Sequence, residues 1–255
     1  MNRARIIPVL LLHKGGLYKT ARFNKPIYVG DPINAVKIFN EKEIDEIVVL
    51  DIDASREERG PNFEQIAEIA SEAFVPLAYG GGVRSVDDAQ RLFYLGTEKV
   101  ILNYTAFNKP ALISQIANRF GTQSVVVSID YKRNFFGKPM VYTLNGKHST
   151  RMDPVTYAKK MVGCGAGEII LNCIERDGTY AGYDIETISA VSAAIPVPLV
   201  ALGGASSLED LRSAIHAGAS AAAAGSMFVF QRPHQAVLIN YPNQILLERF
   251  IFGNL

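Results

Sequence analysis

The feature that most constrains the fold is a series of eight short apolar runs that alternate with helical segments. The runs cover residues 6–12, 47–52, 76–79, 99–102, 125–130, 168–171, 198–202 and 221–224. Most of them are apolar throughout rather than alternating, which is typical of parallel strands covered on both faces by helices. Eight strands of this kind predict a closed (β/α)8 barrel, also called a TIM barrel.

The segments between the runs carry helix start signals. A capping side chain or a proline suited to the first helical turn stands at Asp31-Pro32, Asn108-Lys109-Pro110, Asp153-Pro154 and Ser206-Ser207. Strands and helices alternate without a visible linker, so we expect residues 1–255 to form a single barrel domain.

The two halves of the chain repeat each other. At one constant spacing, Asp31-Pro32 recurs as Asp153-Pro154, Glu46-Ile47 as Glu168-Ile169, Leu95-Gly96 as Ala217-Gly218, and Asn103-Tyr104 as Gly225-Ser226. The run Gly80-Gly81-Gly82 aligns with Gly203-Gly204-Ala205 after a displacement of one further residue. A doubly wound open sheet shows the same alternation of strands and helices, but two duplicated half-barrels explain the repeat better.

Charge and cysteine content restrict the partners. A formal net charge of +1 gives the protein no net electrostatic field that would attract polyanions. We therefore expect neither nucleic acid nor a membrane as a partner. Cys164, Cys173 and the four histidines show no disulfide framework and no ligand spacing, so we expect no metal and no other cofactor. The basic start lacks a signal-peptide cleavage site, and no run reaches the roughly 18 apolar residues of a membrane span. The expected location is the cytoplasm.

The loops at the carboxyl ends of the strands are the expected active site, as in other barrels. Several of them are built from glycine or small residues: Gly80-Gly81-Gly82, Asn103-Tyr104-Thr105, Gly203-Gly204-Ala205 and Gly225-Ser226. Bare backbone amides there approach phosphate oxygens closely. A tight turn explains any one glycine, but the duplicated set predicts two phosphate sites on opposite sides of the mouth.

Asp130 ends the fifth run, so we expect its carboxyl group to face the mouth as a general acid or base. A helix cap or a loop salt bridge is the alternative interpretation. Matching the strand patterns of the two halves sets Leu11 against Asp130, and leucine cannot transfer a proton.

Other polar residues stand near strand ends. Asp51, Asn172 and Asp177 are candidates for substrate binding, although Asp177-Gly178 also fits an ordinary turn. Lys19 lies in the long first loop, residues 13–30, whose glycines suggest a lid over the mouth. A lysine on such a lid is able to reach a phosphate, although a solvated loop lysine is the commoner case.

Several motifs are informative as a set: Arg5-Ile6-Ile7-Pro8, Gly30-Asp31-Pro32, Leu50-Asp51-Ile52, Gly80-Gly81-Gly82, Gln123-Ser124-Val125-Val126-Val127, Gly165-Ala166-Gly167-Glu168-Ile169 and Arg176-Asp177-Gly178-Thr179. Together they resemble the cyclase subunit of imidazole glycerol phosphate synthase over nearly the whole chain. The resemblance implies a barrel of the ribulose-phosphate-binding type. It also implies a reaction that joins ammonia to a bis-phosphorylated substrate and releases imidazole glycerol phosphate and an aminoimidazole nucleotide.

By this resemblance, Asp130 is one of two catalytic aspartates, and the loops around Gly82, Asn103, Gly204 and Ser226 bind the two phosphates of the substrate. The full expected substrate site is Lys19, Asp51, Gly81, Gly82, Asn103, Asn172, Asp177, Gly178, Gly203, Gly204, Gly225 and Ser226.

Arg5, Glu46, Lys99 and Glu168 match a ring of charges that the family places at the amino-terminal end of the barrel. In the family, ammonia enters there from a docked glutaminase subunit, and we expect the same partner and ammonia gate here. Each of the four stands at the start of a strand, where two positive and two negative charges can neutralise one another. A purely structural barrel floor is the alternative interpretation.

The resemblance breaks at Leu11, where the family has its other catalytic aspartate, and at Leu202, where a small polar residue is expected. Both changes, with the opening Leu10-Leu11-Leu12-His13 and the tail from Val237 to Pro242, resemble a paralogous branch found in lipopolysaccharide O-antigen gene clusters. That branch implies ammonia supply to a separate amidotransferase, which converts an N-acetyl group of a nucleotide sugar to an acetamidino group.

Other functions remain open. An ordinary cyclase of histidine biosynthesis that tolerates Leu11 is one, and a silent scaffold that only docks and activates the glutaminase is another. A phosphoribosyl isomerase has the same repeat, but it needs two aspartates and has no use for a charged floor.

Overall fold

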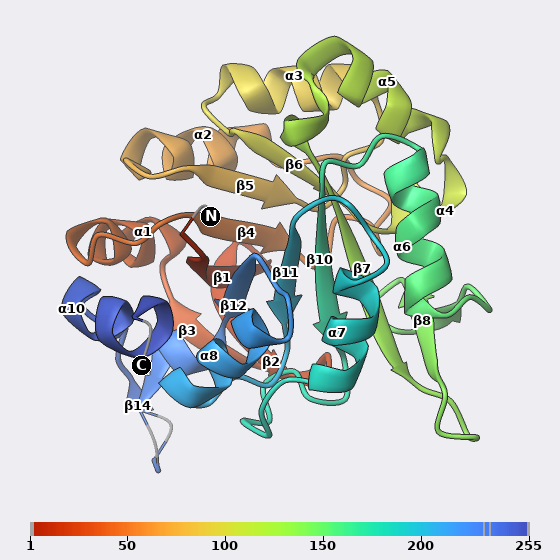
Figure 1. Ribbon diagram of the computed structural model, residues 1–255. Helices are drawn as coiled ribbons and strands as arrows, with labels where there is room; N and C mark the ends of the chain where they lie inside the picture. Colours follow the sequence, from red (N-terminus) through yellow and green to blue (C-terminus); the bar gives the residue numbers. More distant parts are fainter. Residues whose placement is uncertain (1–2, 232, 235, 254–255) are drawn as a thin grey trace.

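A closed ring of eight parallel strands forms the centre of the computed structural model, which describes residues 3–231, 233–234 and 236–253 (Figure 1). In ring order the strands are β1 (Arg5–His13), β4 (Ile47–Asp51), β5 (Leu77–Gly80), β6 (Lys99–Leu102), β7 (Val125–Arg133), β10 (Glu168–Cys173), β11 (Leu199–Leu202) and β12 (Ala221–Ala224). The ring closes because β12 pairs in parallel with β1, with Ala221 opposite Arg5. Every apolar run contains or overlaps one of these strands, so the predicted (β/α)8 barrel is confirmed.

Helices form the outer layer of the barrel (Figure 1). They are α1 (Pro32–Glu41), α2 (Phe63–Glu72), α3 (Val86–Tyr94), α4 (Tyr104–Asn108), α5 (Ala111–Phe120), α6 (Pro154–Gly163), α7 (Ile185–Ser192), α8 (Leu208–His216), α9 (Ser226–Val229) and α10 (Gln244–Leu247), with a 3-10 turn at Thr122–Ser124 and a π-helical turn at Glu248–Phe252. The predicted start signals act as caps. The side chain of Asp31 accepts from the backbone amide of Asn34, and that of Asp153 from the amide of Thr156.

Two apolar layers explain why the strands lack alternation. Side chains such as Ile7, Val48 and Val126 fill the inside of the barrel, whereas neighbours such as Ile6 and Val49 pack outward against the helices. Successive side chains of a strand point to opposite faces, so a strand buried on both faces is apolar at every position.

Strand register shows the duplication directly. Leu11 lies opposite Leu50 between β1 and β4, and Asp130 lies opposite Asn172 between β7 and β10. Asn172 stands one repeat spacing after Leu50, so Leu11 is the counterpart of Asp130, as the strand patterns predicted.

The displaced alignment of the glycine runs was wrong, because Leu50 pairs with Gly80 and Asn172 pairs with Leu202. Leu202 therefore occupies the place of Gly80, without any displacement.

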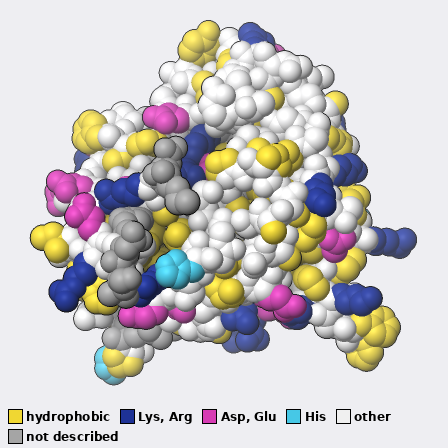
Figure 2. All heavy atoms as spheres, in the orientation of Figure 1, with side chains coloured by type: hydrophobic (Ala, Val, Ile, Leu, Met, Phe, Trp, Pro, Cys, Tyr) yellow, Lys and Arg dark blue, Asp and Glu magenta, His cyan; other side chains and the backbone are white. Residues whose placement is uncertain are grey.

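Short antiparallel strands extend the barrel. They are β2 (Gly16–Ala21), β3 (Asn24–Gly30), β8 (Pro139–Thr143) and β9 (His148–Ser149), with a separate pair formed by β13 (Phe230–Gln231) and β14 (Ala236–Val237). The first loop was expected to be a lid, but β2 pairs with the end of β1 and β3 pairs with β2, so the segment is a hairpin. The hairpin of β7 and β8 projects beyond the barrel, and hydrophobic side chains cover its tip (Figures 1 and 2).

In the described part of the chain, each helix is too short or too polar to cross a membrane.

Candidate active site

Asp130 lies at the wall of a cavity of about 100 Å³ at the carboxyl ends of the strands. The side-chain amide of Asn172 donates to Oδ1 of Asp130 at 3.0 Å, and that of Asn103 donates to Oδ2 at 2.9 Å. Burial raises the pKa of Asp130 to about 7; the amide of Asn172 opposes the shift, the nearby charge of Asp177 adds to it, and the amide of Asn103 opposes it. The group is therefore close to half-protonated at neutral pH, which suits proton transfer.

Across the ring from Asp130, its counterpart Leu11 lines the cavity. Leu50 on β4 and Leu202 on β11 also line it, and Leu202 lies beside Asn172. The cavity therefore combines three leucines with the polar side chains of Asp130, Asn172, Lys19 and Asp177. An acid/base pair formed by two carboxyl groups at the symmetric positions is absent.

Lys19 is buried in the cavity wall rather than exposed on a loop. It belongs to β2, is only 4% exposed, and its ammonium donates to the backbone oxygen of Val9. Burial lowers the pKa of Lys19, and the carboxylate of Asp177 opposes this effect. Gly225 makes room for the ammonium, since a Cβ atom at this position would lie 2.5 Å from Nζ of Lys19.

A second cavity of about 100 Å³ lies beside the first and shares Asp130 with it. Gly81, Gly82 and Asn103 line the second cavity, whereas Asp177, Gly225 and Ser226 line the first. The structure therefore brings most of the expected substrate site to one mouth, in two groups. We call the lining around Gly81, Gly82 and Asn103 the first-half cradle.

Gly178, Gly203 and Gly204 line neither of these two cavities. A Cβ atom on Gly178 would lie 2.2 Å from the backbone oxygen of Thr20, and one on Gly204 would lie 2.1 Å from that of Gly182. These glycines allow backbone segments to pack closely. That close packing by itself explains why glycine occupies these positions.

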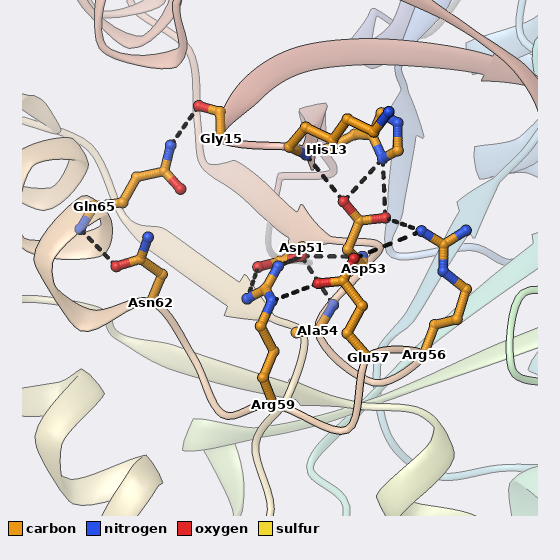
Figure 3. A network of polar contacts seen from close by, with 11 residues as sticks. His13, Gly15, Asp51, Asp53, Ala54, Arg56, Glu57, Arg59, Asn62 and Gln65 are labelled. Carbon is orange, nitrogen blue, oxygen red and sulfur yellow. Dashed lines mark hydrogen bonds and ion pairs between the residues drawn. The ribbon is translucent and has the colours of Figure 1, made fainter.

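Asp51 organises the loop after β4 (Figure 3). Its Oδ1 accepts from the amides of Asp53 and Ala54 at 3.0 and 3.1 Å, and Arg59 forms an ion pair with Oδ2 at 2.7 Å. The carboxylate lines the second cavity, but it accepts its hydrogen bonds from residues of its own loop.

The sequence interpretation missed a neighbouring polar cluster (Figure 3). Nδ1 of His13 lies 2.8 Å from Oδ2 of the buried Asp53, which also accepts from the amide of Lys14 and pairs with Arg56. Burial acts to raise the pKa of Asp53, but these hydrogen bonds and charges hold it below its ordinary value. The available signal was a second acidic residue two positions after Asp51, at the end of the same strand.

At the amino-terminal end of the barrel, Arg5, Glu46, Lys99 and Glu168 form a closed ring of ion pairs. Arg5 binds both glutamates, and Nζ of Lys99 lies 2.8 Å from a carboxylate oxygen of each. The two glutamates are almost fully buried, so their charges depend on this pairing. The four charges share one barrel floor, opposite the mouth.

Among the residues that the structure describes, no group of three or more His, Cys, Asp or Glu side chains is placed to hold a metal ion.

Comparisons with known proteins agree with this architecture. Residues 5–233 match the family described as "Histidine biosynthesis protein". The chain is 48% identical over 244 residues to the hisF2 protein of Pseudomonas aeruginosa, whose name provisionally makes it a subunit of imidazole glycerol phosphate synthase; the match covers 95% of this chain and 97% of that protein. It is 40% identical over 229 residues to imidazole glycerol phosphate synthase subunit HisF of Alkaliphilus metalliredigens, covering 89% of this chain and 91% of the relative. The chain therefore belongs to the histidine biosynthesis protein family and, within it, to the HisF-like cyclase subunits of imidazole glycerol phosphate synthase.

Proposed function

We propose that this chain is an ammonia-accepting subunit of the HisF type that has lost most of its cyclase activity and supplies ammonia to a separate amidotransferase in surface-polysaccharide synthesis. The observation that carries the proposal is the contrast between the two ends of the barrel. The floor keeps all four charges in one ring, whereas the mouth has a leucine opposite Asp130.

The leucine at the position symmetric to Asp130 supports the loss of cyclase activity. A reaction that uses one group as acid and another as base needs both within reach of the substrate, and each typically contributes a factor of about 10² to 10⁴. Asp130, with its pKa near 7, remains able to transfer one proton. Leu11 offers no carboxyl group for a second transfer at the symmetric position.

A glutaminase subunit is the proposed partner, because the relatives carry the name of a synthase with such a subunit. The amino-terminal face supports this docking. Phe74, between α2 and β5, and Tyr94, the last residue of α3, are 82% and 80% exposed on the same face as the charged ring. Exposed aromatic side chains are typical anchors of protein interfaces. The phosphate sites at the mouth and the gating of ammonia by the ring belong to the same proposal.

A gain-of-function variant tests it. In complex with the glutaminase, the wild-type chain should convert the cyclase substrate at least about 10²-fold more slowly than an ordinary HisF complex, and Leu11→Asp should recover at least tenfold. Leu50→Asp, which puts a carboxyl group on the neighbouring strand of the same cavity, is the matched control and should recover nothing. Turnover of ordinary magnitude by the wild-type complex would contradict the proposal and identify an ordinary cyclase of histidine biosynthesis.

A further inference from the structure

The barrel contains the same outer cavity twice, once in each half. One cavity, of about 210 Å³, adjoins the loops after β4, β5 and β6, and the other, of about 200 Å³, adjoins the corresponding loops of the second half. Their lining residues correspond at the repeat spacing: Glu58 to Tyr180, Arg84 to Ser206, Thr105 to Met227, Asn108 to Phe230 and Lys109 to Gln231. We call them the first-half and second-half annexes.

The two annexes differ in charge. The second-half annex is lined only by neutral residues, namely Tyr180, Ser206, Met227, Phe230, Gln231, Leu238 and Asn240. The first-half annex is lined by three cations, Arg59, Arg84 and Lys109, and by one anion, Glu58. Since the duplicated fold supplies the same cavity in both halves, the charges are a property of the first half and not of the architecture.

The ion pairs within the first-half annex leave two cations available. Arg59 is neutralised by Asp51 and Glu57. The guanidinium of Arg84 donates to the backbone oxygen of Glu58 at 2.7 Å. The backbone amide of Arg84 donates to Asp88, but within the described residues the side chains of Arg84 and Lys109 form no ion pair with a carboxylate. These two positive charges exceed the single negative charge of Glu58.

The first-half annex opens beside the first-half cradle. Both cavities are lined by Ser55, Gly82, Tyr104 and Thr105, so one ligand can occupy the two cavities together. An anionic group on the backbone of Gly82 would then lie next to Arg84 and Lys109, and a second anionic group bonded to it would extend between these side chains. Guanidinium and ammonium groups are the usual protein ligands of phosphoryl oxygens.

We propose that the first-half cradle and its annex together bind a diphosphate group, so that the ligand carries two linked phosphoryl groups at this end. This inference depends on the mouth being an anion site, which is part of the proposed function, but it does not depend on ammonia transfer or cyclase chemistry.

Calorimetric titration with inorganic phosphate and inorganic pyrophosphate, in buffer without divalent cations, tests the proposal on the purified full chain. The wild-type protein should bind pyrophosphate about tenfold or more tightly than phosphate at one class of sites. Arg84→Ser with Lys109→Gln installs the residues of the second-half annex and should abolish this preference while phosphate affinity stays within about twofold. Glu58→Gln removes the opposing charge and should strengthen pyrophosphate binding.

The matched control removes the same two charges elsewhere. Lys159→Gln with Lys160→Gln changes exposed lysines of α6 that line neither annex, and should leave the preference intact. Equal affinities of the wild type for phosphate and pyrophosphate would overturn the diphosphate site, and so would an equal loss in both double variants. Retained phosphate binding would then show that only the annex, and not the anion site, had been assigned wrongly. Failure of both anions to bind would overturn both assignments.

Discussion

Asp130 is the residue whose chemistry is set most strongly by its surroundings. Two asparagine amides donate to its oxygens, yet burial in the mouth still raises its pKa to about 7. A buried carboxyl group with a raised pKa favours the neutral form and therefore costs the folded state free energy once the unfolded chain ionises.

This cost gives a pH-dependent prediction. The favourable contribution of neutral Asp130 is fully present below its ordinary pKa of 3.8 and is lost as the pH rises to about 7. Asp130→Asn cannot ionise, so its free energy of unfolding relative to the wild type should increase by about 3 kcal/mol between pH 4 and pH 7 and level off about one pH unit higher. Urea unfolding of both proteins across this range measures the difference. A difference that does not change with pH would show that Asp130 has an ordinary pKa in the folded protein.

Single residues were predictable from the sequence where a strand fixed their direction. Asp130 and Leu11 were assigned to corresponding positions because the strand patterns of the two halves match, and register confirms that assignment. Lys19 was misplaced, because its burial depends on β2 folding back over the mouth and on space left by the distant Gly225. No local pattern in the sequence contains such a long-range contact.

The helices repeat between the halves down to their caps. Ser85 is the N-cap of α3 and Ser207 is the N-cap of α8, and each forms a capping box in which Asp88 or Asp210 returns the hydrogen bond. The backbone angles of the two serines agree within a few degrees, with φ of −145° and −149°. Such similar cap geometry implies that the two caps contribute similarly to the free energy of unfolding.

Two substitutions test this equivalence of the elements. Ser85→Ala and Ser207→Ala should each lower the free energy of unfolding by about 1 kcal/mol, because each removes one capping hydrogen bond to a helix amide. The double variant should lose the sum, because the two helices are not adjacent in the barrel. Thermal or urea unfolding measures all three. Values that differ by more than about 1 kcal/mol would mean that the halves have diverged in stability as well as in their annexes.

Among the elements, the strands that are buried on both faces could be predicted from the sequence, whereas the hairpins could not. β1 and β7 show their apolar runs clearly, but the pairing of β2 with β1 and of β8 with β7 extends beyond the barrel. The strand that completes the first hairpin, β3, includes exposed positions such as Tyr28. Its pattern therefore resembles a loop until the partner strand is known.

The whole molecule has two chemically distinct ends. Charges that neutralise one another close the floor, and a cavity lined by Arg84 and Lys109, which form no ion pair with the residues that the structure describes, opens beside the mouth. Large exposed aromatic side chains lie at both ends: Phe74 and Tyr94 near the floor, and Phe135 and Phe136 at the tip of the hairpin between β7 and β8. If a glutaminase docks at the floor, only the first pair can contact it.

This separation makes the last prediction a comparison between two matched variants. Phe74→Ser with Tyr94→Ser should weaken binding of the glutaminase subunit by about tenfold or more, because aromatic anchors contribute a large share of interface energy. Phe135→Ser with Phe136→Ser removes a comparable exposed aromatic area at the opposite end and should leave the affinity unchanged. Titration calorimetry of each variant with the glutaminase gives the two affinities. A loss of affinity confined to the hairpin variant would place the docking surface at the mouth. Ammonia delivered there would not pass the ring of Arg5, Glu46, Lys99 and Glu168. The assignment of that ring as a gate would then be wrong.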